Sequence, residues 1–342
     1  YFCTFDLLLF LIYYNTNKND LLNYSYPELI SLIKILIVDD SAFMRVKIRS
    51  MLESDPNMKV IGVARNGFEA VEKVQRYKPD VVTMDILMPR MSGIEAVEMI
   101  MQKCPTPILL ISSLTRESME QTIQALEMGA IDYIQKDQLQ PQTLIEKINA
   151  IAQGSMLANT QRKNRQNTQA HTLPRSANNS FSIVCIGSST GGPKALAEVI
   201  PYIQPAIVVP IVIAQHMPPL FTKFLAQRLN SISKIPVTEL ENNQQLLPAH
   251  VYICPGGMNI AIEKRGHAFL YPKEKFNYTY SPSVDLLMKT AGQVYGAGAL
   301  CIIMTGMGVD GLEGIREAKK LGSYVIAQSE STCTIYGMPR AI

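Results

Sequence analysis

The sequence has no paired cysteines and no long apolar run. Its six cysteines are isolated, without a C-x-x-C pair, which is typical of a reducing compartment and not of a disulfide framework or a zinc site. The apolar run Leu7–Tyr14 is too short to span a bilayer, and no basic segment precedes it as in a signal peptide. We therefore expect a cytoplasmic protein without a membrane span.

Outside residues 154–180 the chain also lacks an excess of positive or negative charge. The net charge is +3, but residues 154–180 contain four basic residues and no acidic one. The rest of the chain is then close to neutral, which does not favour a nucleic-acid partner. A helix-turn-helix with a basic recognition helix is also missing from residues 181–342, so a DNA-binding output is not favoured.

The length of 342 residues predicts two domains. Residues 1–33 lack an initiator methionine and are rich in Asn, and we interpret them as an extension outside the fold. We expect a first domain at 34–153, an unstructured Asn/Gln/Thr/Ser-rich linker at 154–180 and a second domain at 181–342.

Strand-like and helix-like segments alternate in both domains, which predicts an α/β protein with two doubly wound parallel sheets. The expected strands of the first domain are 34–38, 60–64, 81–84, 107–111 and 133–135, and the expected helices are 42–54, 67–78, 93–103, 119–128 and 141–152. The expected strands of the second domain are 182–186, 207–214, 251–254, 299–304 and 324–327, with helices starting near Gly192, Leu220, Pro282 and Gly311.

Acidic residues follow the first and third predicted strands of the first domain. Because strand ends meet at one edge of such a sheet, Asp39, Asp40 and Asp85 are expected to converge there. Three carboxylates require a cation, and oxygen ligands suit Mg²⁺. We predict that Asp39, Asp40, Asp85 and the Leu87 carbonyl form a Mg²⁺ site.

The same edge has the groups that phosphoryl transfer requires. Asp85, alone after the central strand, is the predicted nucleophile for an incoming phosphoryl group. Ser112 and Lys136 follow the next two strands and are predicted to contact the phosphoryl oxygens.

The second domain contains a G-x-S-x-G pattern, Gly187–Gly191, between a predicted strand and a predicted helix. A serine nucleophile needs a histidine base, itself oriented by a carboxylate. His216 and Asp310 each follow another strand, which predicts a Ser189–His216–Asp310 triad. The chain order Ser, His, Asp is not that of α/β-hydrolases, so a different α/β scaffold is implied.

An alternative interpretation comes from the pattern Gly306-x-Gly308-x-x-Gly311, which matches a dinucleotide fingerprint, with Glu330 about twenty residues on. Against it, Asp310 lies inside the loop and would repel a pyrophosphate. The runner-up hypothesis is therefore a phospho-switched binding module without catalysis, with nucleotide binding through this loop as one form of it.

Residues 34–153 resemble a response-regulator receiver domain. The resemblance rests on Val38–Ser41, Met84–Pro89, Ile111–Ser113, Tyr133 and Lys136. The chain reads Asp137 where that family has a proline after the lysine. The resemblance implies phosphorylation of Asp85 by a chemotaxis histidine kinase, with Mg²⁺ as cofactor.

Residues 181–342 resemble the catalytic domain of chemotaxis protein-glutamate methylesterases. The matching segments are Ile186–Pro193, Gln215–Pro218, Pro255–Gly257, Ser283–Asp285, Thr305–Gly311 and Tyr336–Pro339. The family nucleophile, base and acid fall on Ser189, His216 and Asp310, and the backbone N–H of Met307 is the implied oxyanion donor.

The resemblance implies a hydrolase that demethylates glutamate methyl esters and deamidates glutamines on chemotaxis receptors. It implies that the unphosphorylated receiver domain covers the serine site, and that the catalytic domain needs no cofactor. We expect a monomer. The family has a further short tail past Ala341, so the second domain is expected to be C-terminally truncated.

Overall fold

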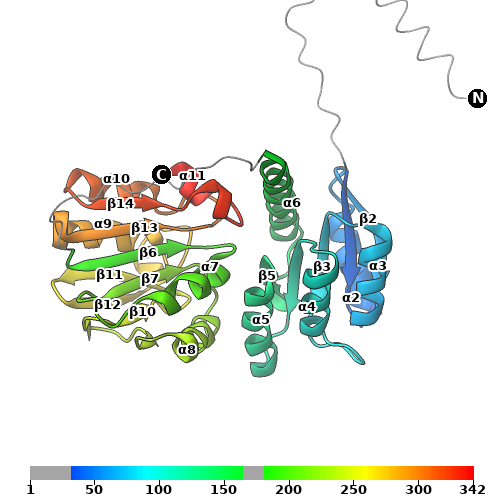
Figure 1. Cartoon of the computed structure of the whole chain (residues 1–342), viewed down its shortest axis with the longest axis horizontal. Coiled ribbons are helices and arrows are strands. Elements are labelled where there is room, and N and C mark those ends of the chain that lie inside the picture. The colour runs from blue at the N-terminus through cyan, green and yellow to red at the C-terminus, as the bar shows by residue number, and fades with distance from the viewer. Residues whose placement is uncertain (1–31, 165–180) are drawn as a thin grey trace, which may run out of the picture. The chain divides into compact units, whose positions relative to one another are not determined.

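The computed structural model describes residues 32–164 and 181–342, without side chains for 155–164. Residues Ile33–Ile342 form one compact unit, in which two α/β blocks follow each other along the chain (Figure 1). The expected extension at 1–33 therefore lies almost wholly outside the described residues, as does the part of the expected linker at 165–180.

The first block is a five-stranded parallel sheet with the strand order β2-β1-β3-β4-β5. Sheet growth reverses direction between β1 and β3, and ligands bind at such a switch point. The strands are β1 (Ile33–Val38), β2 (Met58–Ala64), β3 (Val81–Asp85), β4 (Ile108–Ser112) and β5 (Asp132–Gln135). The helices are α2 (Ala42–Leu52), α3 (Gly67–Tyr77), α4 (Gly93–Lys103), α5 (Arg116–Met128) and α6 (Pro141–Asn164).

Side-chain caps fix where the helices of this block begin. Ser41, Asn66, Ser92 and Thr115 each accept a hydrogen bond from a backbone N–H in the first turn of α2, α3, α4 and α5. Such a cap satisfies one of the N–H groups that a helix start leaves unpaired. Each loop after a strand therefore ends at a defined residue, and the strand-end side chains keep their positions.

The second block contains a six-stranded parallel sheet with the order β14-β13-β6-β7-β10-β8. Its strands are β6 (Ile183–Ser188), β7 (Ile211–Gln215), β8 (Val237–Glu239), β10 (Val251–Ile253), β13 (Ala299–Ile303) and β14 (Tyr324–Ala327). Its helices are α7 (Gly192–Val199), α8 (Phe221–Ile232), α9 (Val284–Tyr295), α10 (Leu312–Lys320) and α11 (Met338–Ala341). The central strand β6 has β13 on one side and β7 on the other, so it marks the switch point of this sheet.

A three-stranded antiparallel sheet, β11 (Met258–Lys264), β12 (His267–Pro272) and β9 (Gln244–Gln245), accompanies the second block. This sheet was not predicted, because the expected elements of the second domain alternated regularly between strand and helix. A signal was present, since the apolar run in β11 ends at Arg265–Gly266 and Gly266 takes a φ of 76° in the turn. The two predicted parallel sheets are thus present, with this antiparallel addition and with the edge strand β8, which was not predicted either.

Two boundaries differ from the expectation. Helix α6 continues to Asn164 instead of ending at Ala152, so the first part of the expected linker is helical. Its composition resembled a linker, but residues 155–164 contain no proline or glycine to end a helix. Strand β7 begins at Ile211 and not at Ile207, directly after Pro210, which has no N–H for a sheet.

The five cysteines that the structure describes, Cys104, Cys185, Cys254, Cys301 and Cys333, are all free, as expected. Burial strongly raises the pKa of the Cys185 thiol, so it behaves as a small apolar side chain. Within residues 32–164 and 181–342, no helix has both the length and the apolar character needed to span a bilayer.

Candidate active site and phosphoryl-acceptor site

Three aspartates lie together at the carboxyl edge of the first sheet. Asp39 and Asp40 follow β1 and Asp85 ends β3, and one carboxylate oxygen from each lies within 4.8 Å of the others. Asp39 and Asp85 are buried, whereas Asp40 is exposed. The structure therefore brings together the aspartates of the predicted metal site.

Lys136 neutralises only part of this charge. Its Nζ lies 2.7 Å from Asp85 Oδ2 and 3.1 Å from Asp39 Oδ2. Burial raises the pKa of Asp85 to about 6, although the hydrogen bond and the charge of Lys136 act in the opposite direction. Burial also opposes the charge on Lys136, but the Asp85 and Asp39 carboxylates together outweigh it and the pKa of Lys136 is raised. One ammonium group for three carboxylates leaves the cluster negative.

The residues of this cluster fit a magnesium ion. All the side-chain ligands are carboxylate oxygens, and the buried Asp39 Oδ2 has the Lys136 ion pair but no donor in hydrogen-bonding geometry. Leu87, the source of the predicted carbonyl ligand, lies in the loop between β3 and α4. When bound, Mg²⁺ would supply the positive charge that an incoming phosphoryl group requires.

Ser112 ends β4 but its hydroxyl is engaged elsewhere. Ser112 Oγ lies 2.8 Å from Ser118 Oγ and 2.8 Å from Thr122 Oγ1, both on α5. All three residues are buried. In this arrangement the Ser112 side chain contacts α5. The structure thus leaves the predicted role of Ser112 as a prediction.

Ser189 lies in the turn between β6 and α7. The turn requires glycine at two positions. Gly191 has a φ of 78°, and a Cβ there would lie 2.4 Å from Thr334 Cβ. A Cβ on Gly192 would lie 1.9 Å from Gln215 Oε1. The close packing of these glycines allows the sharp bend that presents Ser189 at the end of the sheet.

Gln215 braces this turn through three hydrogen bonds. Ser188 Oγ donates a 2.6 Å hydrogen bond to Gln215 Oε1, and Gln215 Nε2 donates to the backbone oxygens of Ser189 at 2.9 Å and His216 at 3.1 Å. The end of β7 therefore holds the nucleophile turn and the histidine together. No role in the site was predicted from the sequence for Ser188 or Gln215.

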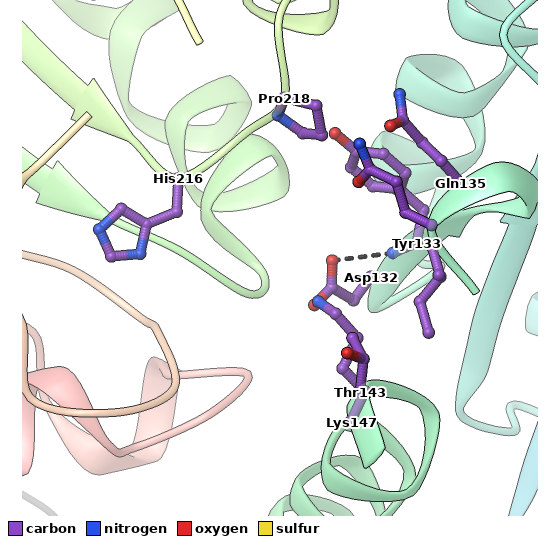
Figure 2. A pocket seen from close by; sticks show the side chains of 9 residues that line it. Asp132, Tyr133, Gln135, Thr143, Lys147, His216 and Pro218 are labelled. Atoms are coloured by element: carbon purple, nitrogen blue, oxygen red, sulfur yellow. Dashed lines mark hydrogen bonds and ion pairs between the residues drawn. The ribbon is translucent and has the colours of Figure 1, made fainter. Parts of the chain in front are cut away.

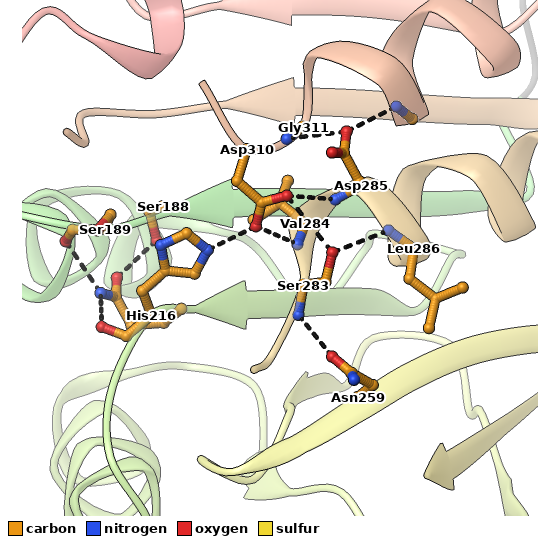
Figure 3. A network of polar contacts seen from close by, with 12 residues as sticks. Ser188, Ser189, His216, Asn259, Ser283, Val284, Asp285, Leu286, Asp310 and Gly311 are labelled. Atoms are coloured by element: carbon orange, nitrogen blue, oxygen red, sulfur yellow. Dashed lines mark hydrogen bonds and ion pairs between the residues drawn. The ribbon is translucent and has the colours of Figure 1, made fainter. Parts of the chain in front are cut away.

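His216 and Asp310 form the predicted pair. His216 Nε2 lies 2.7 Å from Asp310 Oδ2, and both side chains are mostly buried (Figure 3). The other ring nitrogen, His216 Nδ1, is buried and has no hydrogen-bond partner among the described residues. No hydrogen bond joins Ser189 to His216 within the described chain. If Nε2 carries the proton toward Asp310, Nδ1 is the nitrogen left to act as a base.

Asp310 is fixed by the start of α9. Its carboxylate accepts hydrogen bonds from the backbone N–H of Val284 at 2.8 Å and of Asp285 at 3.1 Å, and from Ser283 Oγ at 3.4 Å. Burial opposes its charge, but the hydrogen bond from His216, the charge of His216 and these amides outweigh burial and lower the pKa of Asp310. The acid therefore stays ionised, in a fixed orientation toward His216.

The loop of Met307 lies against the nucleophile. A Cβ on Gly306 would lie 2.9 Å from Ser189 Cβ, so only glycine lets the loop approach this closely. Ser189 N–H donates to Thr305 O at 3.0 Å, which ties the loop to the turn. The described chain supplies no acceptor for Met307 N–H, in keeping with its predicted role as an oxyanion donor.

The dinucleotide alternative gains no support from this loop. In a nucleotide site the N–H groups at the start of the helix bind the pyrophosphate. Here Asp285 Oδ1 already accepts from Gly311 N–H at 3.0 Å and from Gly314 N–H at 2.7 Å. A carboxylate thus occupies the place where a phosphate would need these donors.

Comparison with known proteins decides the family. The CheB methylesterase family model matches residues 184–342, and the response regulator receiver domain model matches residues 35–149. The chain is 41% identical over 322 residues to a protein-glutamate methylesterase/protein-glutamine glutaminase of Thermotoga maritima, covering 91% of this chain and 92% of that protein. The chain belongs to the CheB methylesterase family.

The chain is also similar to other proteins. A protein-glutamate methylesterase/protein-glutamine glutaminase from Lawsonia intracellularis is 40% identical over 330 residues, covering 90% of this chain and 92% of the relative. The crystal structure of the Thermotoga maritima CheB methylesterase catalytic domain is 40% identical, with a TM-score of 0.45, and covers 47% of this chain and 87% of that chain. The crystal structure of the Thermotoga maritima CheB response regulator domain is 43% identical, with a TM-score of 0.30, and covers 40% of this chain and 99% of that chain.

Residues of the receiver domain contact the methylesterase domain beside the serine site. Thr190, next to Ser189, donates a 2.6 Å hydrogen bond to Asp132 Oδ2, which also pairs with Lys147. Tyr133 stacks on Phe221 at 4.5 Å between ring centroids. From the sequence, Tyr133 was matched only as part of the receiver motif. No role was predicted for Asp132, Lys147, Thr190 or Phe221.

A cavity of about 310 Å³ lies beside these contacts (Figure 2). It is lined by Asp132, Tyr133, Ile134, Gln135, Gln138, Thr143, Lys147, His216 and Pro218. His216 and Pro218 line this space from the methylesterase domain, and its other walls come from β5, the short segment after it and α6. Receiver residues therefore form most of the wall of this space.

The Lys136–Asp137 peptide, where the receiver family has a proline, begins a short 3₁₀ turn at Lys136–Gln138. In the described part of the chain the cis peptide bond is Ser281–Pro282, so the Lys136–Asp137 bond is trans. Lys136 nevertheless reaches both Asp39 and Asp85. The departure from the family pattern leaves the contacts of the lysine in place.

Proposed function

We propose that this chain is a phosphorylation-controlled protein-glutamate methylesterase that also deamidates glutamine side chains on chemotaxis receptors. The observation that supports it most is the His216–Asp310 pair, whose unpartnered Nδ1 lies at the same sheet edge as the Ser189 turn. Membership of the CheB family and the receiver domain on the same chain support the substrate class and the control.

In the first half of the reaction, Ser189 Oγ attacks the γ-carbonyl carbon of a glutamyl methyl ester. His216 Nδ1 takes the Ser189 proton, and Asp310 stabilises the imidazolium that forms. The carbonyl electron pair moves onto its oxygen, where Met307 N–H donates to it. Collapse of this oxyanion breaks the bond to the methoxy group, which takes the proton from His216 and leaves as methanol.

In the second half, water attacks the acyl-enzyme. His216 Nδ1 takes a proton from the water, and the bond between the acyl carbon and Ser189 Oγ breaks. Ser189 recovers its proton from His216, and the receptor keeps a glutamate. A glutamine substrate follows the same steps, with ammonia as the leaving group in place of methanol.

The receiver domain controls access in this proposal. The contacts of Asp132 with Thr190 and of Tyr133 with Phe221 tie the unphosphorylated receiver to residues beside the nucleophile. A receptor helix cannot approach Ser189 while these contacts persist. Phosphorylation of Asp85 by a chemotaxis histidine kinase, with Mg²⁺ at the acidic cluster, removes Lys136 from its present partner and shifts the equilibrium toward the open arrangement.

The remaining parts of the proposal follow from the substrate. The ester groups lie on cytoplasmic receptor helices, so the enzyme acts in the cytoplasm. The hydrolysis needs no cofactor in the methylesterase domain, because every step uses a side chain or backbone group of this chain. One copy of the chain supplies all the named groups, which agrees with a monomer.

The test is methanol release from receptor fragments that carry glutamate methyl esters. The full chain is assayed with and without acetyl phosphate and Mg²⁺, as wild type, as Ser189→Ala and as Ser182→Ala, a change of an exposed serine before β6. We expect release that rises on phosphorylation and disappears in Ser189→Ala, whereas Ser182→Ala retains most of it. Phosphorylation of the Ser189→Ala protein is measured as well, so that loss of the esterase reaction can be distinguished from loss of phosphorylation.

Labelling with a serine-directed fluorophosphonate gives a second readout. Attachment of the label at Ser189 would support Ser189 as the nucleophile, even if the chosen receptor fragment is a poor substrate. A folded, phosphorylated chain that neither releases methanol nor is labelled at Ser189 would contradict the proposal and favour a binding module without catalysis.

A further inference from the structure

One short segment of the methylesterase domain touches both members of the His216–Asp310 pair. Its C-terminal part, Ser283–Asp285, donates three hydrogen bonds to Asp310. Its N-terminal residue, Tyr280, stacks on His216. The segment is held from outside, because Gly257 N–H donates to Ser281 O at 3.1 Å and Ser283 N–H donates to Asn259 Oδ1 at 2.9 Å.

The stacking geometry is close to parallel. The ring centroids of Tyr280 and His216 lie 4.4 Å apart with an interplanar angle of 14°. The Tyr280 hydroxyl lies over the oxyanion loop, because a Cβ on Gly308 would be 3.4 Å from Tyr280 Oη. Tyr280 thus covers the imidazole and the residue after Met307 at the same time.

Among the ring contacts that the structure describes, Tyr280 has one, with His216. It is 39% exposed, so it contributes little to the core. Its hydroxyl makes no hydrogen bond with any of the described residues. A large, half-exposed aromatic ring that lies flat on a buried histidine therefore has the histidine as its main partner.

His216 needs such a partner. A single hydrogen bond from Nε2 to Asp310 fixes one atom of the ring, but it leaves the tilt of the ring plane, and hence the aim of Nδ1, less well defined. A ring stacked on the face of the imidazole restricts that tilt. Misplacement of a catalytic group by about 1 Å is enough to cost about a hundredfold in rate.

We propose that Tyr280 is a positioning residue of the esterase, which acts on the reaction through His216, and this inference rests on the proposed function. The Tyr280 ring keeps Nδ1 directed at Ser189 and lies against the imidazolium that forms when His216 takes the serine proton. An aromatic face attracts a cation, so the contact is stronger in the transition state than in the ground state. The contribution comes from the ring and not from the hydroxyl.

The experiment compares three variants of the full chain, phosphorylated with acetyl phosphate and Mg²⁺. Tyr280→Leu removes the ring, and Tyr280→Phe keeps the ring and removes the hydroxyl. Tyr278→Leu is the matched control, because Tyr278 lies two residues away and its ring tilts against Phe276 at 6.1 Å instead of stacking on His216. Methanol release gives kcat and KM, and NMR of the imidazole protons gives the stacking directly.

We expect kcat to fall about tenfold in Tyr280→Leu with little change in KM, since an aromatic pair of this kind contributes about one factor of ten. Tyr280→Phe and Tyr278→Leu should stay within about twofold of wild type if the ring alone matters. The His216 proton resonances should shift downfield in Tyr280→Leu, where the ring current is lost, and stay in place in the other two variants.

Three outcomes overturn the inference: unchanged kcat in Tyr280→Leu, equal losses in Tyr280→Leu and Tyr280→Phe, or equal losses in Tyr280→Leu and Tyr278→Leu. Failure of the proposed function is distinguishable from these. In that case wild-type chain releases no methanol, while the histidine resonances still report whether Tyr280 stacks on His216.

Discussion

The acidic cluster of the receiver domain and the serine site of the methylesterase domain occupy equivalent places in two parallel sheets, but their carboxylates are stabilised differently. Asp39 and Asp85 share one lysine, and burial raises the pKa of Asp85 to about 6. Asp310 has three donors from one helix start in addition to His216, and its pKa is lowered.

This difference matches the two tasks. One lysine only partly offsets the charge of the acidic cluster, so binding of Mg²⁺ and a phosphoryl group would have a large electrostatic effect there. The serine site holds its acid and its histidine before any substrate arrives, and such preorganisation lowers the cost of forming charge in the transition state. We therefore expect ligand binding to alter the acidic cluster, whereas the groups of the serine site are already arranged before a substrate binds.

The largest expected effect comes from Asp310→Asn. Asp310 Oδ2 accepts from both His216 and Val284 N–H, and Oδ1 accepts from Asp285 N–H, so an amide NH₂ in place of either oxygen faces a donor. The change also removes the negative charge that stabilises the imidazolium. We expect kcat for methanol release to fall by about four orders of magnitude. The control is Glu313→Gln, an exposed acid near the same loop whose side chain is 67% exposed, which should leave kcat unchanged. A loss of less than tenfold in Asp310→Asn would show that the carboxylate is not what orients His216.

The next effect is on the switch. Asp85→Asn removes the proposed phosphoryl acceptor, so acetyl phosphate and Mg²⁺ should no longer stimulate methanol release, while the unstimulated rate remains. Asp137→Asn, an exposed acid beside Lys136, is the matched control and should respond like wild type. Incorporation of radioactive phosphate into Asp85→Asn protein would place the modification on another residue.

A smaller effect is expected on stability from Asp285→Ala. The N–H groups of Gly311 and Gly314 lose their acceptor at the start of α10, which should lower the free energy of unfolding by about 1–3 kcal/mol. Asp285→Asn keeps one acceptor oxygen and should lose less. Denaturant unfolding measures both, and equal stability of wild type and Asp285→Ala would show that water replaces the carboxylate at no cost.

The smallest effect is stabilisation by magnesium. Mg²⁺ at ten times its Kd should stabilise the native chain by about 1.4 kcal/mol, seen as a rise in Tm. The rise should disappear in Asp39→Asn and persist in Asp310→Asn, because only the first change touches the metal site. An equal rise in both variants would mean that the ion binds elsewhere.

The sequence was sufficient for the α/β class, for both parallel sheets and for the aspartates of the acidic cluster. These features depend on short-range patterns: apolar runs of strand length, helix-length amphipathic segments and polar residues directly after strands. The outcome for Asp39, Asp40 and Asp85 was predictable because parallel strands must end at one edge. The same rule placed His216 and Asp310 together.

The contacts that hold these side chains were not predictable in the same way. Gln215 braces the nucleophile turn, and Tyr280 stacks on His216 although 64 positions separate 216 and 280 in the sequence. The antiparallel sheet and the continuation of α6 to Asn164 were also missed. Gln215 and Tyr280 contact residues far along the chain, and the composition of residues 155–164 favoured a linker where a helix formed. The β11–β12 hairpin had a local signal at Gly266, but the expected alternation of strand and helix left no place for it.

The sequence by itself determined which chemical groups stand at the ends of the strands, because alternation of strand and helix leaves few ways to arrange them. Tertiary structure alone decided which atom of His216 faces Asp310, that Nδ1 has no hydrogen-bond partner among the described residues, and that Ser112 contacts α5. The physical reason is that a strand end fixes the position of a Cα atom, whereas the direction of a side chain depends on every group packed around it.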